Sequence, residues 1–379
     1  MKPLFLRSSK EALVKKIQQY HLLGNDEKKY WAYRHHLCPV SILEEAFLKN
    51  KNRKDKEGII SAIVLNPSLP WSLAVKILET NQKPYIVKNL NRHINNPGFQ
   101  KTVTDDLSSF CLDFFNAFIP AISIKEFKEN SFISGNSIRH FINKHGDDNQ
   151  TPPLNDIDFF FTNKDYAEKL LSSILGNIPF DEDTSLKVVK NDKGLSIEGL
   201  PKRSLLKATS NYYPGYSFTI TENALTIEHL GSIRNVRTPK KFQLIYRYID
   251  SAEKVTGDFD FAHCTGIYDF KELKISSVCA DSIYRHYLVY QGGSNPIESM
   301  VRSIKFCSQG MRIEKSDLLK IALHSQTFNV KDPEVLNNQL KAYYGGKDRY
   351  PETQVLGTEE LSEEELTNLL DYLSSKHLF

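Results

Sequence analysis

Hydrophobic residues recur at helical spacing through the first third of the chain. Apolar positions three and four apart predict helices at 41–50, 72–80 and 106–118. Prolines separate these segments, and Asn66–Pro67 and Asn96–Pro97 align at a spacing of 30. Helix pairs at a regular spacing are typical of helical repeat proteins. We therefore expect residues 1–120 to form a helical domain, which is either repeat-like or irregular.

After residue 120 the pattern changes to short runs of alternating or continuous apolar residues. Such runs predict strands, here at 131–135, 157–161, 186–190, 216–220, 224–230, 241–249 and 258–264. Helices are expected from Ser137 onward and over 163–175, between the early strands. Early helices followed by an antiparallel run predict an α+β domain over 121–275 rather than a doubly wound parallel sheet.

Helical periodicity returns over residues 276–379, which we expect to form a C-terminal helical domain. The predicted helices lie at 278–291, 295–310, 315–326, 332–346 and 362–377. Gly310 is placed to end the second of them. Ser362 and Glu365 form a capping-box pattern at the start of the last.

Composition and charge narrow the class of protein. A length of 379 residues favours two or three domains, and a net charge of +3 gives weak support to an anionic partner. The five cysteines include no C-x-x-C pair, which fits reduced thiols and gives no zinc site. No apolar run is long enough to cross a membrane or to form a signal peptide. We expect a cytoplasmic protein with no membrane partner.

Two acidic residues interrupt the apolar strand at 157–161. Asp156 and Asp158 are two residues apart, so they share one face of the strand. Neighbouring carboxylates repel each other, and burying them without a partner is costly. Mg²⁺ would remove both costs, and a pair of such ions supports phosphoryl transfer. The alternative is an exposed Asp-x-Asp with no bound metal.

A glycine turn precedes these acids by about twenty residues. An apolar strand, then Gly135, then a helix would leave free backbone N–H groups at the positive end of the helix dipole. Such a turn can bind phosphate, with Gly135, Asn136, Ser137 and Arg139 as the candidate residues. The alternative is an ordinary capped helix after a loop.

A third carboxylate is expected near residue 260. Asp260 lies between Phe259 and Phe261, and a strand placed beside 155–161 would bring it next to the first two acids. There it would act as a metal ligand or as the base that accepts a hydroxyl proton. Asp258 is the competing candidate, and a solvated strand end is the alternative to both.

Together these features resemble the DNA polymerase β-like nucleotidyltransferase superfamily, which has a glycine turn, a D-x-D strand and a later carboxylate. The segment 132–142 is similar to the G-G-x-x-R-D segment of CCA-adding enzymes and bacterial poly(A) polymerases. Gly135, Ser137 and Arg139 fall on matching positions, whereas Asn136 replaces a glycine and His140 an acidic residue. The strands around 222–261 also look like phage-encoded members of the superfamily.

The segment 294–313 is similar to the helix that follows the catalytic core in such enzymes. Arg302 and Lys305 lie three apart on one helix face, and the resemblance implies that they reach the nucleotide phosphates. A solvated basic face is the alternative for this helix.

The resemblance implies a nucleotidyltransferase-type mixed sheet and a two-metal site, with Mg²⁺ or Mn²⁺ on Asp156, Asp158 and Asp260. It implies transfer of a nucleoside monophosphate from an NTP to a hydroxyl acceptor, with release of pyrophosphate. RNA with a tRNA-like 3′ end is the expected acceptor, and a protein is the alternative. Two rival hypotheses are a catalytically degenerate nucleotide- or RNA-binding protein of the same fold, and a toxin or effector that nucleotidylates tRNA or protein.

Overall fold

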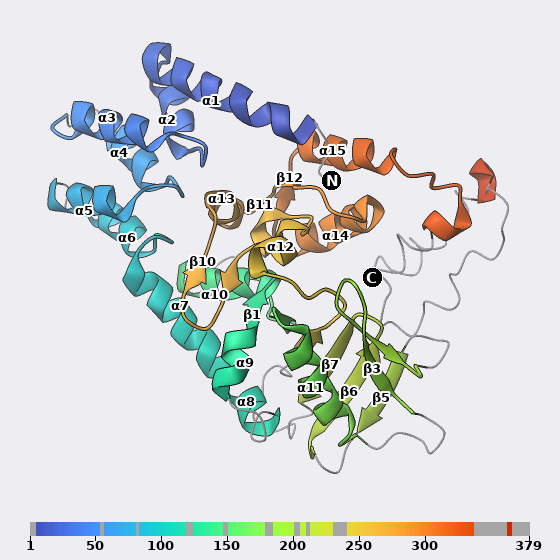
Figure 1. The fold of residues 1–379 in the computed structure, drawn as a ribbon. Coiled ribbons are helices and arrows are strands. Elements are labelled where there is room, and N and C mark those ends of the chain that lie inside the picture. The colour runs from blue at the N-terminus through green and yellow to red at the C-terminus, as the bar shows by residue number, and fades with distance from the viewer. Residues whose placement is uncertain are drawn as a thin grey trace.

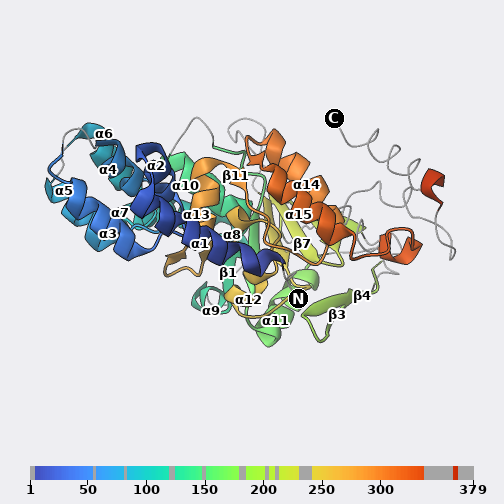
Figure 2. The same cartoon turned by 90° about the horizontal axis from the view of Figure 1, so that it is seen from above.

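The computed structural model describes residues 5–53, 57–80, 83–118, 124–146, 151–178, 185–200, 205–209, 213–229, 241–336 and 362–365. These residues form an α+β fold in which helices surround a central mixed sheet (Figure 1). An array of helices from the N-terminal third lies at one end of the molecule, as the view from above also shows (Figure 2).

The central sheet has eight strands in the order β10-β9-β1-β2-β8-β7-β6-β5. Their bounds are β1 Ser131–Ser134, β2 Ile157–Phe161, β5 Leu205–Thr209, β6 Tyr216–Thr221, β7 Ala224–His229, β8 Lys241–Ile245, β9 Ile267–Tyr268 and β10 Leu273–Lys274. Strands β2 and β8 pair in parallel, whereas all the other neighbours in this sheet are antiparallel. The order places β2, which carries the two acids, between β1 and β8.

Six of the seven predicted strands are present, and the seventh is wrong. The predicted strand 258–264 follows helix α12 (Ala252–Gly257), which Asp258 caps in a helical conformation. A bend and a short 3₁₀ helix (Ala262–Cys264) come next. The apolar residues there pack without a pleated strand: Phe261 is buried in one apolar cluster, and Phe259 packs against that cluster and a second one.

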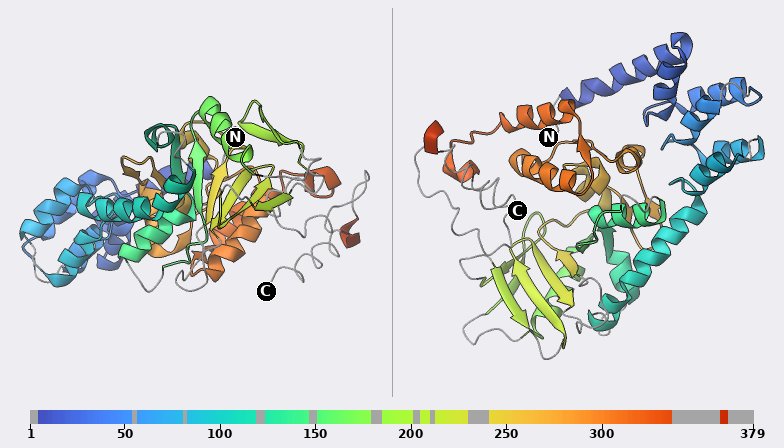
Figure 3. Two further views of the ribbon diagram at one scale, coloured as in Figure 1. Left: turned by 90° about the horizontal axis from the view of Figure 1, so that it is seen from below. Right: turned by 180° about the vertical axis from the view of Figure 1, so that it is seen from behind.

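Six further strands among the described residues were not predicted as strands, among them β9 and β10 at one edge of the central sheet. Strand β4 (Leu195–Glu198) pairs with β3 (Lys187–Lys190) in a hairpin beside helix α11 (Lys164–Leu175), as Figure 3 shows. Strands β11 (Tyr287–Leu288) and β12 (Arg312–Ile313) form a parallel pair, and β5 extends the central sheet. At two residues, β11 and β12 are too short for an alternating pattern to reveal them.

The N-terminal part is helical, as expected. Its helices are α1 Phe5–Leu23, α2 Asp26–Arg34, α3 Val40–Asn50, α4 Glu57–Val64, α5 Trp71–Thr80, α6 Pro84–Asn91, α7 Pro97–Phe110, α8 Leu112–Phe118 and α9 Ile124–Asn130. The turns after α2, α4 and α6 share one backbone hydrogen-bond pattern, centred on His35, Asn66 and His93. Four residues after each of these comes a proline, which directly precedes the next helix (Pro39, Pro70) or begins it (Pro97). Asn66 is thus equivalent to His93, and the expected alignment of Asn66 with Asn96 is not the structural one.

The first part of the chain and the part that carries the sheet have separate apolar cores. One core contains residues from Ile17 to Leu90, and the other begins at Ile94 and continues to Ile283. Helices α7 and α8 belong to the second core, where the rings of Phe114 and Phe159 stack at 4.8 Å. The division between cores therefore falls between Leu90 and Ile94, and not at the expected boundary of residue 120.

The C-terminal helices pack over the loop that carries Asp260. Helices α13 (Ser277–Arg285), α14 (Pro296–Ser308) and α15 (Lys315–Ser325) lie where three of the predicted helices were expected. Gly310 follows α14 with a φ of 86°, as predicted for a helix stop. The capping box is confirmed, because Ser362 N donates to Glu365 Oε2 at 2.9 Å and Glu365 N donates to Ser362 Oγ at 3.2 Å. The remainder of that predicted helix, and the chain from 337 to 361, lie outside the described residues.

Among the described residues, no helix combines the length and the apolar character that crossing a membrane requires.

Candidate functional site

The turn between β1 and helix α10 (Asn136–Gly146) requires glycine. Gly135 has a φ of 96°, and its N–H donates to the Cys264 carbonyl at 3.0 Å. The Ser134 hydroxyl donates to the Gly266 carbonyl at 2.6 Å, which fixes the end of β1. A Cβ atom at position 135 would lie 3.0 Å from Asp158 Oδ2. The turn and the acid strand therefore touch, as the sequence predicted.

Polar atoms at the start of α10 are buried without partners. Asn136 Oδ1 and Ser137 Oγ have no hydrogen-bond partner among the described residues. Buried polar groups are normally paired, and each exception calls for an explanation. Here the exceptions lie at a helix N-terminus, whose backbone N–H groups and dipole favour an anion.

Arg139 does not lie on the open side of this turn. Its side chain is fully buried, and Nη2 donates to the Gln309 carbonyl at 3.1 Å. Burial lowers the pKa of Arg139 to about 10, so the guanidinium stays charged at neutral pH. Arg139 thus ties α10 to the end of α14, and the phosphate contact expected for it stays a prediction. His140 departs from the family pattern, and its Nδ1 lies 2.7 Å from the carbonyl of Pro152, in the segment that precedes β2.

The two acids of the D-x-D segment lie side by side. Asp156 directly precedes β2, and Asp158 pairs with Ser134 of β1 and Gln243 of β8 in the sheet register. Burial raises the pKa of both carboxyls, and the charge of Asp156 raises the pKa of Asp158 further. Asp158 Oδ1 is buried and has no hydrogen-bond partner among the described residues. The pair therefore brings two carboxylates together in a poorly solvated place, which raises the pKa of both.

The structure distinguishes between the two candidates for the third acid. Asp258 is exposed and accepts a hydrogen bond from the Tyr248 hydroxyl at 2.9 Å. Asp260 is 5% exposed, and its Oδ1 lies 3.2 Å from Arg302 Nη1. The expected strand beside β2 is wrong, because β1 and β8 occupy both sides of β2. Asp260 instead comes from the bend after α12.

Both predicted cations of α14 act on the acid pair. The charges of Arg302 and Lys305 lower the pKa of Asp158 against the larger effect of its burial, and Lys305 does the same for Asp156. Burial by itself would lower the pKa of Arg302. The pKa is nevertheless held above its ordinary value by nearby acidic groups, of which Asp260 has the largest effect and Asp158 is another. Arg302 therefore electrostatically links the third acid to the first two.

The sequence interpretation missed three side chains at this site. Lys241 and Gln243 lie on β8, where Lys241 is in electrostatic reach of Asp156 and Gln243 is beside Asp158. Their alternation with buried Phe242 and Leu244 was visible, but only the sheet order shows that β8 is next to β2. Glu298 lies one helical turn before Arg302, and burial raises the pKa of its carboxyl. Its spacing of four from Arg302 was the available signal.

A divalent cation fits part of the expected ligand set. Asp156 and Asp158 supply the oxygen donors that Mg²⁺ or Mn²⁺ prefers, and Asp158 Oδ1 lacks a partner. Asp260, expected as the third ligand, is paired with Arg302 instead. In the part of the chain that the structure describes, no three His, Cys, Asp or Glu side chains are grouped as a ready metal site. The fit therefore extends to the D-x-D pair.

Comparison with known proteins gives one family and one solved structure. Residues 108–288 match the Gad2 family, described as "Gabija anti-defense 2 family protein". The chain is also similar to the CCA-adding enzyme of Bacillus stearothermophilus, solved in complex with CTP, at 11% identity and a TM-score of 0.35. That match covers 63% of this chain and 49% of the enzyme's chain. No curated protein matches. The family match includes the glycine turn and all three acids, and it ends before α14.

Proposed function

We propose that the protein is a metal-dependent nucleotidyltransferase that moves a nucleoside monophosphate from an NTP to a hydroxyl acceptor. One observation carries this proposal. Buried oxygens of Asn136 and Ser137, which follow Gly135, and of Asp158, whose carboxylate borders the Gly135 turn, lack hydrogen-bond partners among the described residues. Two cations of α14 act on the same carboxylates. Unsatisfied polar atoms at a helix N-terminus, beside paired acids and cations, suit a metal-bound triphosphate.

Each residue has a role in this proposal. The phosphates bind at the turn of Gly135, Asn136 and Ser137, and Arg302 and Lys305 neutralise their charge. Asp156 and Asp158 hold Mg²⁺ or Mn²⁺, which when bound offsets negative charge on the phosphates. Arg139 supports the turn from the interior.

The proposed reaction is a displacement at phosphorus. The acceptor oxygen forms a bond to the α-phosphorus, and the bond from that phosphorus to the bridging oxygen breaks. Pyrophosphate leaves with the electron pair of the broken bond. The acceptor proton passes to a carboxylate of the site, for which Asp260 is our candidate because Arg302 links it electrostatically to Asp158. Positioning and charge stabilisation supply most of the rate enhancement.

The family resemblance favours one form of this proposal, in which the acceptor is the 3′ hydroxyl of an RNA. The match to the Gad2 family over 108–288 favours a second, compatible role in anti-defense. In that role, nucleotide transfer onto a component of a Gabija system would inactivate it. The acceptor is then either an RNA or a protein of that system.

Labelled nucleotides test both forms of the proposal. The full chain is incubated with each α-labelled NTP, Mg²⁺ or Mn²⁺, and either total RNA or a Gabija protein preparation. We expect label in RNA or protein. The double variant Asp156→Asn/Asp158→Asn should lose about 100-fold or more of the transfer, as expected when charge stabilisation is removed from a reaction. Asp258→Asn, which removes an exposed acid nearby, should retain it.

The binding-only rival gives a different result. A catalytically degenerate protein would show a higher melting temperature with nucleotide and Mg²⁺, because ligands that bind the folded state stabilise it. It would place no label in RNA or protein with any NTP or metal. That combination of results would replace the transferase proposal with the rival.

A further inference from the structure

A second basic site lies at the opposite end of α10 from the glycine turn. A cavity of about 460 Å³ is lined by helices of the N-terminal array and by α10 and α13. Gly146, the last residue of α10, lines it, whereas Asn136 begins the helix at the turn. At 1.5 Å per residue, an 11-residue helix separates its two ends by roughly 15 Å. The cavity is therefore distinct from the proposed transferase site.

The charge of this cavity is strongly positive. Arg34, Lys88, Arg92 and Arg285 line it, and Asp281 is its only acidic lining residue. No described acid forms an ion pair with Arg34, Lys88 or Arg92. Gathering like charges costs free energy, which an anionic ligand would offset.

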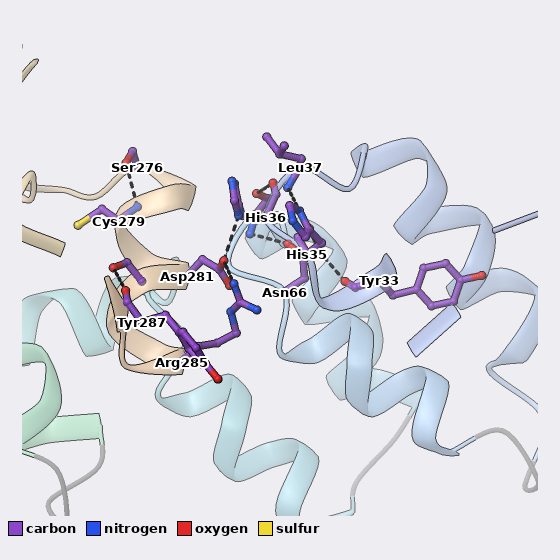
Figure 4. A network of polar contacts seen from close by, with 12 residues as sticks. Tyr33, His35, His36, Leu37, Asn66, Ser276, Cys279, Asp281, Arg285 and Tyr287 are labelled. Carbon is purple, nitrogen blue, oxygen red and sulfur yellow. Dashed lines mark hydrogen bonds and ion pairs between the residues drawn. The ribbon is translucent and has the colours of Figure 1, made fainter. Parts of the chain in front are cut away.

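One wall of the cavity is held rigidly. Asp281 is 2% exposed, and its Oδ2 accepts a hydrogen bond from Arg285 Nη2 at 2.9 Å. The same oxygen lies 3.0 Å from His36 Nδ1, as Figure 4 shows. Arg285 Nε is buried and has no hydrogen-bond partner among the described residues. The guanidinium is thus positioned by Asp281, yet retains an unused donor.

Rings and an amide complete the lining of the cavity. His286 lines it and caps α13 in the left-handed region with a φ of 54°. Tyr85 and Tyr284 add aromatic rings, and Asn89 adds an amide. Cations, aromatic rings and an amide together suit a phosphate, a base and a base edge.

We propose that this cavity binds a nucleotide unit, with its phosphates against Arg34, Lys88, Arg92 and Arg285. A volume of about 460 Å³ is in the range of small-ligand sites. The unit belongs either to a free nucleotide or to a nucleic acid strand, which present the same chemistry. The proposal does not depend on nucleotidyl transfer at the Gly135 turn.

Binding in the presence of EDTA tests this proposal. EDTA removes divalent cations, so Asp156 and Asp158 then repel phosphates from the transferase site, and the binding that remains is expected at the cavity. The probes are fluorescent ATP and a short labelled single-stranded RNA at low ionic strength, followed by fluorescence anisotropy. We expect Lys88→Glu/Arg92→Glu to weaken binding about tenfold or more, since phosphate contacts dominate such affinities. Lys76→Glu is the matched control, because it reverses an exposed charge on α5 outside the cavity. It should change the affinity by less than about twofold.

A competition measurement distinguishes a free nucleotide from a nucleic acid strand as the ligand. Competition of unlabelled ATP against the RNA indicates a free nucleotide site, and RNA binding without competition indicates nucleic acid; both support the proposal. Lys88 and Arg92 are exposed, so the double variant should keep its melting temperature. The milder Lys88→Gln/Arg92→Gln should give an intermediate loss.

Two outcomes overturn the proposal. One is that neither probe binds in EDTA, and the other is that the charge-reversal variant binds as the wild type does. Asp156→Asn/Asp158→Asn separates the two sites, because it should leave binding in EDTA at or above the wild-type level. Loss of transfer with retained binding in EDTA would leave the cavity proposal intact, and the reverse result would leave the transferase proposal intact.

Discussion

Asp158 combines burial, a neighbouring carboxylate and an oxygen with no partner among the described residues. Burial raises its pKa in the folded state, so the wild-type free energy of unfolding falls as the pH rises through that raised pKa. Asp158→Asn removes this charge at nearly constant shape. We expect a gain of about 1 kcal/mol at neutral pH, with loss of nucleotide transfer. Thermal melts from about pH 5 to pH 8 measure the first effect.

Asp258→Asn is the control for this prediction, since the Asp258 carboxylate is exposed. It should change neither the pH dependence nor the transfer. If Asp158→Asn melted below the wild type throughout this range, the carboxylate would stabilise the fold, and our inference that its burial costs stability would be wrong.

Alanine substitutions at two glycines separate the effect of backbone conformation from the effect of contact with the Asp158 carboxylate. Alanine at a left-handed φ costs roughly 1–2 kcal/mol, and at position 135 its Cβ would also lie 3.0 Å from Asp158 Oδ2. Gly215 has a φ of 83° with nothing within 4 Å of its added Cβ. We expect Gly135→Ala and Gly215→Ala to lower the melting temperature similarly, with loss of nucleotide transfer only in the first. Equal transfer by the two variants would contradict the proposed phosphate turn.

The chemical character of these residues was predictable, but their partners were not. The D-x-D spacing predicted that Asp156 and Asp158 share a face, and in the structure the charge of Asp156 acts on Asp158. Arg139 looked like a phosphate ligand because it lies in the first turn of α10, yet its side chain is fully buried. The direction of a side chain depends on what packs around the helix, which here is the end of α14.

At the scale of elements, the helical array is joined by polar contacts between successive turns. Asn66 Nδ2 donates to the carbonyls of Tyr33 at 2.6 Å and His35 at 3.0 Å. His93 Nε2 lies 2.8 Å from the Asn66 carbonyl, which continues the series to the next turn. Buried amide contacts of this kind fix how neighbouring helix pairs stack.

Asn66→Ala should therefore destabilise the array. The variant leaves two carbonyls without their donor, which we expect to cost about 2 kcal/mol or more in the free energy of unfolding. Asn91→Ala is the control, because Asn91 is exposed at the end of α6 and should cost under about 0.5 kcal/mol. Urea unfolding followed by far-ultraviolet circular dichroism measures both. Similar midpoints for the two variants would show that the polar contacts contribute little.

Element types were largely predictable from periodicity, but one was misread for a physical reason. The run from Asp258 to Cys264 alternates as a strand does, yet α12 continues to Gly257 directly before it. The parallel pairing of β2 with β8 also has no local signal, since the two strands are far apart in the sequence. That pairing is what brings Lys241 and Gln243 to the acids.

At the scale of the whole molecule, Asp281 joins the N-terminal array to the sheet-bearing part. Its carboxylate contacts His36, from the turn after α2, and Arg285 of α13 (Figure 4). Burial alone would raise the pKa of Asp281, but the hydrogen bond with His36 and the charge of Arg285 hold it below its ordinary value.

A lowered pKa predicts how stability depends on pH. The stabilising contribution of Asp281 is present above the ordinary aspartate pKa of about 4. It is lost as the pH falls from there through the lowered value. The melting temperature of Asp281→Asn should therefore lie below that of the wild type at pH 5–7, at a cost of about 3 kcal/mol for a broken buried pair.

The difference between Asp281→Asn and the wild type should shrink in acid, below about pH 4. Asp105→Asn is the comparison, because Asp105 forms an exposed ion pair with Lys101. Exposed pairs contribute little, so this variant should follow the wild type at every pH. A constant difference for Asp281→Asn down to acid pH would rule out the linkage.

The sequence by itself determined the α+β class, the helical N-terminal part, strands such as β1, β2 and β8, the glycine turn, and the acids and cations that define the candidate chemistry. These features depend on spacing along the chain, which periodicity and short motifs report directly. Only the tertiary structure decided that Asp260 is buried whereas Asp258 is exposed, that Arg302 pairs with Asp260, and that the first core ends at Leu90. It also decided that basic residues from α2, α6 and α13 line one cavity. These depend on contacts between segments far apart in the chain, and local patterns hold no information on which segments will meet.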